Sequence, residues 1–204
     1  MRLLIVGAGG HAKVVADAAR SAGVGVSVLG TGKDPDSVLG IPVLREAERP
    51  DADFFIVAVG DNRSRATLYE RWLERGLQPA SVVHPSAVVA DSARVGPGTF
   101  IAAGVVVNAE ADIGANAILN TGCTVDHDCR IGDHAHIGPG ASLCGAVGIG
   151  EGALVGVGAC ASPGVAVGAW SVVGAGAAIT VDLPGNAVCV GVPARPVRNV
   201  DDGS

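Results

Sequence analysis

The stretch ADIGANAILNTGCTVDHDCRIGDHAHIGPGASLCGAVGIG, residues 111–150, places an aliphatic side chain at every sixth position. The same spacing continues in both directions, from Val83 to Ile179, without an insertion and with Ala161 as its one lapse. A helix repeats every 3.6 residues and a strand alternates every two, so neither explains this period. Hexapeptide periods are typical of parallel β-helices, in which short strands stack coil upon coil. The sequence therefore predicts a β-helix of about five coils over this region.

Two further positions of the hexapeptide carry a consistent residue type. The residue two places before each aliphatic position is small or β-branched, which would keep the interior uncrowded where the chain turns. Glycine often follows the aliphatic position, and we expect it to relieve backbone strain at the corners. These glycines are Gly96, Gly114, Gly132, Gly138, Gly150, Gly156, Gly168 and Gly174.

Length and composition narrow the class of protein. The repeat leaves about 80 residues before it, enough for a small α/β unit, so we expect two domains, residues 1–80 and 81–204. The net charge of −6 argues against non-specific nucleic-acid binding, which needs a basic surface. We expect no membrane association, because no apolar stretch is long enough to span a bilayer and no signal-peptide cleavage pattern is present. Five cysteines without CxxC spacing favour a reduced, cytoplasmic protein, with Cys123 and Cys129 in the core.

The N-terminal block shows the pattern of a Rossmann-like βαβ unit. A glycine-rich turn separates the first strand from the first helix, and a later strand ends in Gly60-Asp61-Asn62-Arg63. The expected elements are strand 1–6, helix 12–22, strand 24–29, strand 54–59 and helix 63–75.

The glycine-rich turn, Gly7 to Ala12, fits the pattern G-x-G-x-x-A. Backbone N–H groups at the start of a helix can hold a diphosphate. A dinucleotide site also needs an acidic residue at the end of the second strand, where this chain has Gly30 and Thr31, with Asp34 several residues later. The turn therefore favours a nucleotide diphosphate over NAD. A glycine-rich turn without a ligand is the alternative.

His11 lies inside this turn, where the phosphate or sugar of a ligand would bind. A histidine in a glycine-rich turn does not pack a core, so we expect it to contact the ligand. The alternative is a residue at the start of the helix that faces solvent.

His127 stands between Asp126 and Asp128 at outward-facing positions of the repeat. Neighbouring carboxylates hold an imidazole in one tautomer and raise its basicity, as a general base requires. An exposed histidine in a polar corner is the alternative. His136 follows half a coil later, so the two rings would lie on different faces of one subunit and meet only across a subunit interface. The spacing of these histidines and His134 does not bring three imidazoles together, so we expect no metal.

Taken together, these motifs resemble the bacterial nucleotide-sugar acetyltransferases of the sialic acid O-acetyltransferase (NeuD/PglD-like) family. The resemblance covers almost the whole chain and implies that the β-helix is left-handed. It rests on Val6-Gly7-Ala8-Gly9-Gly10-His11, Phe54-Phe55-Ile56-Val57-Ala58-Val59-Gly60-Asp61-Asn62, His84-Pro85-Ser86-Ala87, Asn120-Thr121-Gly122, Asp126-His127-Asp128 and Gly191-Val192-Pro193-Ala194-Arg195.

The resemblance implies that the N-terminal domain binds a nucleotide sugar. Gly9, Gly10 and His11 would lie near its diphosphate or sugar. Gly60 and Asn62 would line the same pocket.

The resemblance also implies the roles of the coil residues. His127 would be the general base that takes a proton from the acceptor amine, and Asp128 would raise its basicity. His136 would contact the thioester or pantetheine of acetyl-CoA in an adjacent subunit, together with the backbone around Gly145. Transfer would be direct, in a homotrimer, without an acetyl-enzyme and without a metal.

The expected reaction is acetylation of the 4-amino group of a UDP- or GDP-linked 4-amino-4-deoxy sugar. Members that bind UDP can carry paired aspartates after the second strand, where Gly30 and Thr31 stand here, so the base stays open. O-acetylation of sialic acid or another sugar hydroxyl is a second interpretation. A nucleotide-sugar-binding protein without catalysis is a third, and the missing acidic ribose ligand disfavours an oxidoreductase.

Overall fold

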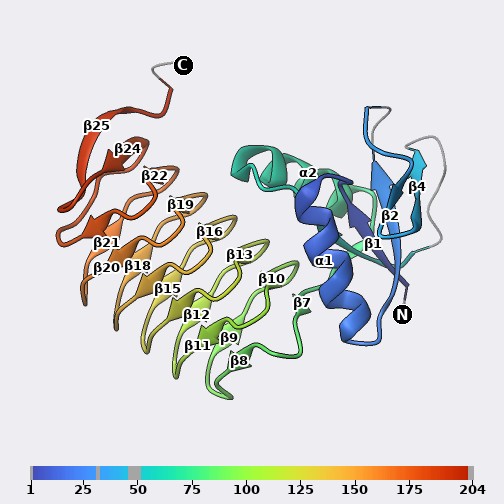
Figure 1. The fold of residues 1–204 in the computed structure, drawn as a ribbon, viewed down its shortest axis with the longest axis horizontal. Coiled ribbons are helices and arrows are strands. Elements are labelled where there is room, and N and C mark those ends of the chain that lie inside the picture. The colour runs from blue at the N-terminus through green and yellow to red at the C-terminus, as the bar shows by residue number, and fades with distance from the viewer. Residues whose placement is uncertain (1, 31–32, 46–51, 202–204) are drawn as a thin grey trace.

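The computed structural model of the protein describes residues 2–30, 33–45 and 52–201 (Figure 1). An α/β unit is followed by a left-handed prism of stacked coils, which ends in a two-stranded C-terminal extension. The predicted fold class, a Rossmann-like α/β subdomain followed by a left-handed parallel β-helix, is confirmed. In the described part of the chain, no helix combines the length and the apolar character needed to cross a membrane.

The N-terminal unit is built on a six-stranded sheet in the order β3-β4-β2-β1-β5-β6. All neighbouring strands are parallel except β3 and β4, a short antiparallel pair that the sequence does not predict. The other predicted elements are confirmed, with ends that differ by one or two residues. The elements are β1 (Arg2–Val6), α1 (Gly10–Ser21), β2 (Gly25–Gly30), β3 (Ser37–Val38), β4 (Ile41–Arg45), β5 (Phe54–Val57), α2 (Asn62–Glu74) and β6 (Gln78–Pro79).

The two helices cover opposite faces of this sheet. Leu3 and Ile5 of β1 belong to the buried cluster on the α1 side. Leu4 and Val6 alternate with them and pack in a second cluster with Trp72 of α2. Because α1 also contacts β7, the α1 face of the sheet lies toward the prism, and one continuous core joins the two parts of the molecule.

Three sheets form the faces of the prism, because each two-residue strand pairs in parallel with the strand 18 residues further along. The domain-facing sheet contains β7 (Val82–Val83), β10 (Phe100–Ile101), β13 (Ile118–Leu119), β16 (His136–Ile137), β19 (Leu154–Val155), β22 (Val172–Val173), β24 (Ala187–Val190) and β25 (Arg195–Asn199). The second sheet contains β8 (Val88–Val89), β11 (Val106–Val107), β14 (Thr124–Val125), β17 (Ser142–Leu143), β20 (Cys160–Ala161) and β23 (Ala178–Ile179). The third sheet contains β9 (Arg94–Val95), β12 (Asp112–Ile113), β15 (Arg130–Ile131), β18 (Gly148–Ile149) and β21 (Ala166–Val167).

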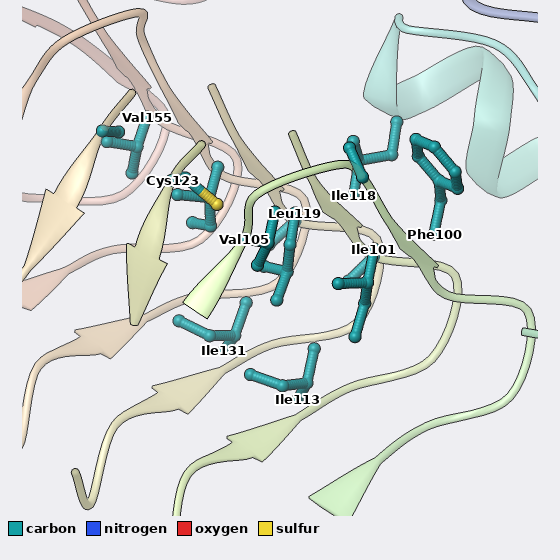
Figure 2. Packing of buried hydrophobic residues seen from close by; sticks show 14 of the residues in the cluster. Phe100, Ile101, Val105, Ile113, Ile118, Leu119, Cys123, Ile131 and Val155 are labelled. Atoms are coloured by element: carbon teal, nitrogen blue, oxygen red, sulfur yellow. The ribbon is translucent and has the colours of Figure 1, made fainter. Parts of the chain in front are cut away.

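The aliphatic positions fill the interior of the prism, as predicted, from Ile101 to Ile179. Figure 2 shows Ile101 pointing inward, whereas Phe100, its neighbour on the same strand, points outward. The first coil is an exception, because it closes one end of the prism and has no coil beyond it. Val83 is accordingly 39% exposed. Cys123 and Cys129 are buried, as predicted.

The predicted role of the glycines that follow the aliphatic positions is wrong. Left-handed backbone occurs two residues later in each hexapeptide, as at Asp128 after Val125, and it recurs at every sixth position from Gly98 to Gly176. The glycines next to the aliphatic residues serve the contact between coils instead. A Cβ added to Gly132, for example, would lie 2.5 Å from the backbone nitrogen of the next coil.

Candidate functional site

A cavity of about 400 Å³ opens at the carboxyl ends of β1, β2 and β5. The strand order reverses between β1 and β5, and ligands of open α/β sheets bind at such a point. Four of the five predicted substrate-binding residues, Gly9, Gly10, His11 and Gly60, line this cavity. The full lining is Val6, Gly7, Ala8, Gly9, Gly10, His11, Leu29, Gly30, Asp34, Ala58, Val59, Gly60, Leu68, Arg71 and Trp72.

The start of α1 forms one wall of the cavity and can bind an anion. Gly9 precedes the helix, and no side chain caps the helix at this point. The first N–H groups of a helix have no partner within it, and the helix dipole favours negative charge there. Gly7 has a φ of 114°, and a Cβ on it would lie 2.9 Å from the carbonyl oxygen of Ala58. The turn therefore needs glycine to bring α1 this close to the end of β5.

His11 lies between the cavity and the domain-facing sheet. Its ring meets the edge of Phe100 at a centroid distance of 5.4 Å, and the ring of His136 lies 6.5 Å away. Burial, and then the positive charge of Arg65, lower the pKa of His11 to about 4, so the ring is neutral at physiological pH. Within the described residues, its buried Nε2 has no hydrogen-bond partner.

Asp34 is a pocket residue that the sequence reasoning missed. It lies beyond the end of β2 in the chain, yet its carboxylate returns to Gly30, where an added Cβ would lie 3.0 Å from Oδ2. A carboxylate is therefore present near the end of the second strand, where the sequence indicates none. Thr31, the other residue at this strand end, lies outside the described residues. No motif in the sequence indicates this placement of Asp34.

Asn62 does not line this cavity, contrary to the expectation. Its side-chain amide donates to the carbonyl oxygens of Gly152 at 2.9 Å and Ala153 at 3.3 Å. It thereby fastens the start of α2 to the prism, beside a smaller hollow of about 200 Å³ that includes Trp170. Its amide nitrogen thus contacts protein, whereas its buried Oδ1 has no hydrogen-bond partner among the described residues.

The His127 corner connects β14 to β15, on the edge between the second and third sheets. The side chain of His127 is 61% exposed, and its Nδ1 donates to Oδ2 of Asp128 at 2.7 Å. This bond fixes the tautomer and leaves the Nε2 lone pair directed away from Asp128. The hydrogen bond with Asp128, followed by the charge of Asp126, raises the pKa of His127 above its ordinary value.

The two aspartates that flank His127 have different tasks. Among the described residues, Asp126 forms no hydrogen bond with the imidazole. Its Oδ1 accepts from the backbone N–H of His127 at 2.8 Å and from the side chain of Asn108, one coil earlier, at 2.9 Å. Asp126 therefore shapes the turn, whereas Asp128 orients the ring.

Gly145 lies directly beside the His127 ring, one coil further along. A Cβ on Gly145 would lie 2.5 Å from Cε1 and 2.6 Å from Nε2 of that ring. Among the described residues, the N–H of Gly145 has no hydrogen-bond acceptor. A basic imidazole nitrogen and a backbone donor thus lie together at one exposed corner.

His136 lies on β16 of the domain-facing sheet, where it contacts the N-terminal domain of the same chain. The side-chain nitrogen of Asn120 lies 3.0 Å from its Nε2, and its buried Nδ1 has no partner within the described residues. Burial, followed by the charges of Arg65 and His11, lowers the pKa of His136 to about 4. His127 and His136 are on different parts of the prism, as expected, but the proximity of His136 to His11 was not anticipated.

The described residues contain no group of three or more histidine, cysteine, aspartate or glutamate side chains placed to hold a metal ion. His134, the third histidine of this region, is 2.9 Å from the side-chain nitrogen of Asn116 through Nδ1, and its ring lies 5.8 Å from that of Tyr69. It belongs to the contact between α2 and the prism.

Comparison with known proteins supports both halves of this architecture. Residues 2–72 match the PglD N-terminal domain, and residues 110–145 match the bacterial transferase hexapeptide family of six repeats. A mutant of perosamine N-acetyltransferase from Caulobacter crescentus, solved with CoA and GDP-perosamine, is 41% identical over 98% of both chains, with a TM-score of 0.94. The chain belongs to the PglD-like hexapeptide-repeat acetyltransferases.

Two further structures show how widely this family fold extends. The acetyltransferase domain of PglB from Neisseria gonorrhoeae, solved with acetyl coenzyme A, is 37% identical over 96% of this chain and 98% of that one, with a TM-score of 0.90. WeeI from Acinetobacter baumannii is 24% identical over 97% of this chain and 100% of that one, with a TM-score of 0.80, and it shows the shared fold alone. The arrangement of α/β unit and prism is therefore shared by these structures.

Proposed function

We propose that this protein transfers the acetyl group of acetyl-CoA to the 4-amino group of a UDP- or GDP-linked 4-amino-4-deoxy sugar. The observation that carries the proposal is the exposed, oriented imidazole of His127 beside the N–H of Gly145, which has no acceptor in the part of the chain that the structure describes. The Caulobacter relative with bound CoA and GDP-perosamine makes a GDP-linked amino sugar the first substrate to test.

The geometry of the His127 corner suits direct acyl transfer. Nε2 of His127 takes a proton from the sugar amine while the amine nitrogen bonds to the acetyl carbonyl carbon. The N–H of Gly145 donates a hydrogen bond to the resulting oxyanion. The carbon–sulfur bond then breaks, and the CoA thiolate takes the proton from the His127 imidazolium. No covalent acetyl-enzyme and no metal ion enter this sequence.

The cavity of the N-terminal domain supplies the features that a nucleotide sugar requires. Its diphosphate would bind the N–H groups of Gly10 and His11 at the start of α1, with Gly60 on the facing wall. Asp34, at the end of β2, would accept hydrogen bonds from ribose hydroxyls, as acidic residues do at this position in dinucleotide sites. Such a contact favours ribonucleotides such as UDP and GDP over dTDP.

A homotrimer would unite the two half-sites. In one chain the cavity lies against the domain-facing sheet, whereas His127 stands on the opposite edge, between the other two sheets. The sugar held by one chain would therefore react at the His127 corner of a neighbour. His136 lies beside His11 and behind the cavity, and its expected contact with the thioester or pantetheine of acetyl-CoA in an adjacent subunit stays a prediction. Because acetyl-CoA and nucleotide sugars are cytoplasmic metabolites, we place the reaction in the cytoplasm.

An acetyl-transfer assay tests this function. The wild-type protein should acetylate GDP-perosamine or a UDP-linked 4-amino sugar, and it should not acetylate the matching 4-hydroxy sugars. The His127→Ala variant should lose about 10²- to 10⁴-fold in rate, as expected for removal of a general base. Activity within a few-fold of wild type would remove His127 from this role, and a preference for hydroxyl acceptors would indicate O-acetylation. Sedimentation of the wild-type protein would test the trimer.

A further inference from the structure

Arg65, on α2, is the largest side chain that is fully buried in the described structure, with 0% of its surface exposed. Its guanidinium is surrounded by backbone carbonyl oxygens from both parts of the molecule. It donates to the carbonyls of Asn116 at 3.0 Å, Val59 at 3.2 Å, Gly60 at 3.3 Å, His134 at 2.5 Å and Ala135 at 3.4 Å.

This guanidinium is charged but forms no ion pair with any carboxylate of the described residues. Burial lowers the pKa of Arg65 to about 10, which still leaves it protonated at neutral pH, and the charge of Asp61 acts only at longer range. A buried cation without an ionic partner lowers stability unless other groups satisfy its donors. The five carbonyl oxygens do so here.

The position of these carbonyls links the substrate cavity to the prism. Val59 and Gly60 form the cavity wall that follows β5. Ala135, on the other side of the guanidinium, immediately precedes His136 on β16. Because the guanidinium is planar and its donors are fixed, it sets the distance between these two segments.

We propose that Arg65 is a positioning residue that aligns the cavity wall with β16, so that His11, which lies beside His136 of that strand, presents its unpartnered Nε2 to the bound sugar. This inference rests on the proposed function. Nε2 of His11 and Nδ1 of His136 are the two buried ring nitrogens without a partner in the described residues. Nε2 of the neutral His11 ring matches a sugar hydroxyl, which can both donate and accept. Asn120 donates to Nε2 of His136, so that neutral ring carries its proton on Nδ1, and it lies behind the cavity rather than in its lining.

The charge of Arg65 supports the same role. Burial is the largest cause of the lowered pKa of His11 and of His136, and the charge of Arg65 is the second largest. For His136, the charge of His11 adds to the effect. A neutral side chain at position 65 should therefore let both pKa values rise, although not fully, because burial is the larger cause. A purely structural arginine would not be expected to change substrate affinity as well.

Three variants separate positioning from stability. Arg65→Met removes the charge and the donors with little change in volume, and Arg65→Lys keeps the charge without the planar fork. Tyr69→Phe is the control, because Tyr69 lies one turn further on the same face of α2 and its hydroxyl donates to the carbonyl of Pro97, away from the cavity. The measurements are KM for GDP-perosamine, KM for acetyl-CoA, and the titration of the five histidines by NMR.

Arg65→Met should raise KM for the nucleotide sugar at least about tenfold, leave KM for acetyl-CoA within about twofold, and raise the pKa of His11 and His136. Arg65→Lys should raise the same KM but leave both pKa values low, and Tyr69→Phe should change neither. A folded Arg65→Met variant with unchanged KM and unchanged histidine titration would overturn the proposal. If Arg65→Met does not fold, an unchanged KM in Arg65→Lys overturns it.

The wild-type protein provides a measurement that needs no variant. Saturation with GDP-perosamine should shift the NMR resonance of the Arg65 Nε–H group, whereas saturation with acetyl-CoA should not. Absence of a shift in a protein that binds and acetylates the sugar would overturn the positioning role alone. Absence of sugar binding altogether would instead overturn the proposed function.

Discussion

Replacing Gly145 by alanine tests the geometry of the His127 corner most directly. The new Cβ would lie 2.5 Å from Cε1 and 2.6 Å from Nε2 of the imidazole, whereas ordinary contacts begin near 3.4 Å. The ring must therefore move by about 1 Å. A displacement of that size at a reacting group can lower the rate about 10²-fold. We expect kcat to fall by about this factor in Gly145→Ala.

Stability should change little in this variant. The side chain of His127 is 61% exposed, so it can swing into solvent without leaving a cavity. Gly145 does not have a left-handed backbone, so alanine causes no strain there. The melting temperature should therefore stay close to that of the wild type while kcat falls. The movement should also break the bond to Asp128, and the pKa of His127 should then return toward its ordinary value.

The assay is steady-state acetyl transfer, combined with NMR titration of His127. Gly148→Ala is the matched control, because Gly148 lies on the next strand and the nearest atom to its added Cβ is 3.9 Å away. That variant should retain wild-type activity. A Gly145→Ala protein with kcat within threefold of wild type would refute the idea that the ring must keep its present place beside Gly145.

Three further predictions concern charged and titratable groups. Asp128→Asn should lower the pKa of His127, because the hydrogen bond from the ring to the carboxylate is lost. The acidic limb of the plot of kcat/KM against pH should then move to lower pH, and the plateau should fall about 10- to 100-fold. An unmoved acidic limb would contradict the role of Asp128 in raising the basicity of His127. Asp34→Asn should weaken the binding of GDP about tenfold but weaken the binding of 2′-deoxy-GDP much less, and calorimetry measures both affinities. An equal loss of affinity for the two nucleotides would exclude a contact between Asp34 and the 2′-hydroxyl. Burial lowers the pKa of His11 and His136 to about 4, so between their ordinary pKa near 6.5 and this value the unfolded chain binds protons that the folded chain does not. Stability should therefore fall as pH decreases through this window, by about 3 kcal/mol per histidine, and His136→Asn should reduce the fall. Urea titrations at several pH values that show an equal fall in the variant would contradict this prediction.

The sequence was sufficient to predict the prism, because its period of six reflects contacts that repeat in every coil. It also predicted that Val125 and Cys129 point inward, and therefore that His127 points outward. The role of the glycines was predicted wrongly for a physical reason. Clashes between coils involve residues 18 apart, such as Gly114 and Gly132, and reasoning about one hexapeptide cannot detect them.

The contacts between the domains were beyond the reach of sequence patterns. Asp34 lines the cavity although it lies beyond the end of β2 in the chain, and Arg65 reaches its carbonyl partners through the docking of α2 on the prism. The family resemblance implied that Asn62 lines the cavity, but its place on α2 turns it toward Gly152. In each of these cases, the position of the side chain depends on how segments far apart in the sequence lie against one another, and local sequence patterns do not indicate this.

The parallel pairing of strands 18 residues apart has a consequence for how this protein tolerates change. Asn108, Asp126 and Cys144 occupy one column of the prism, and His127 and Gly145 occupy the adjacent one. Residues in contact usually show non-additive mutational effects, whereas distant residues usually do not. Epistasis should therefore follow the columns, linking positions separated by one full coil more strongly than many sequence neighbours. Attempts to transplant or redesign this corner should move whole columns, since a single hexapeptide taken alone would leave its vertical partners behind.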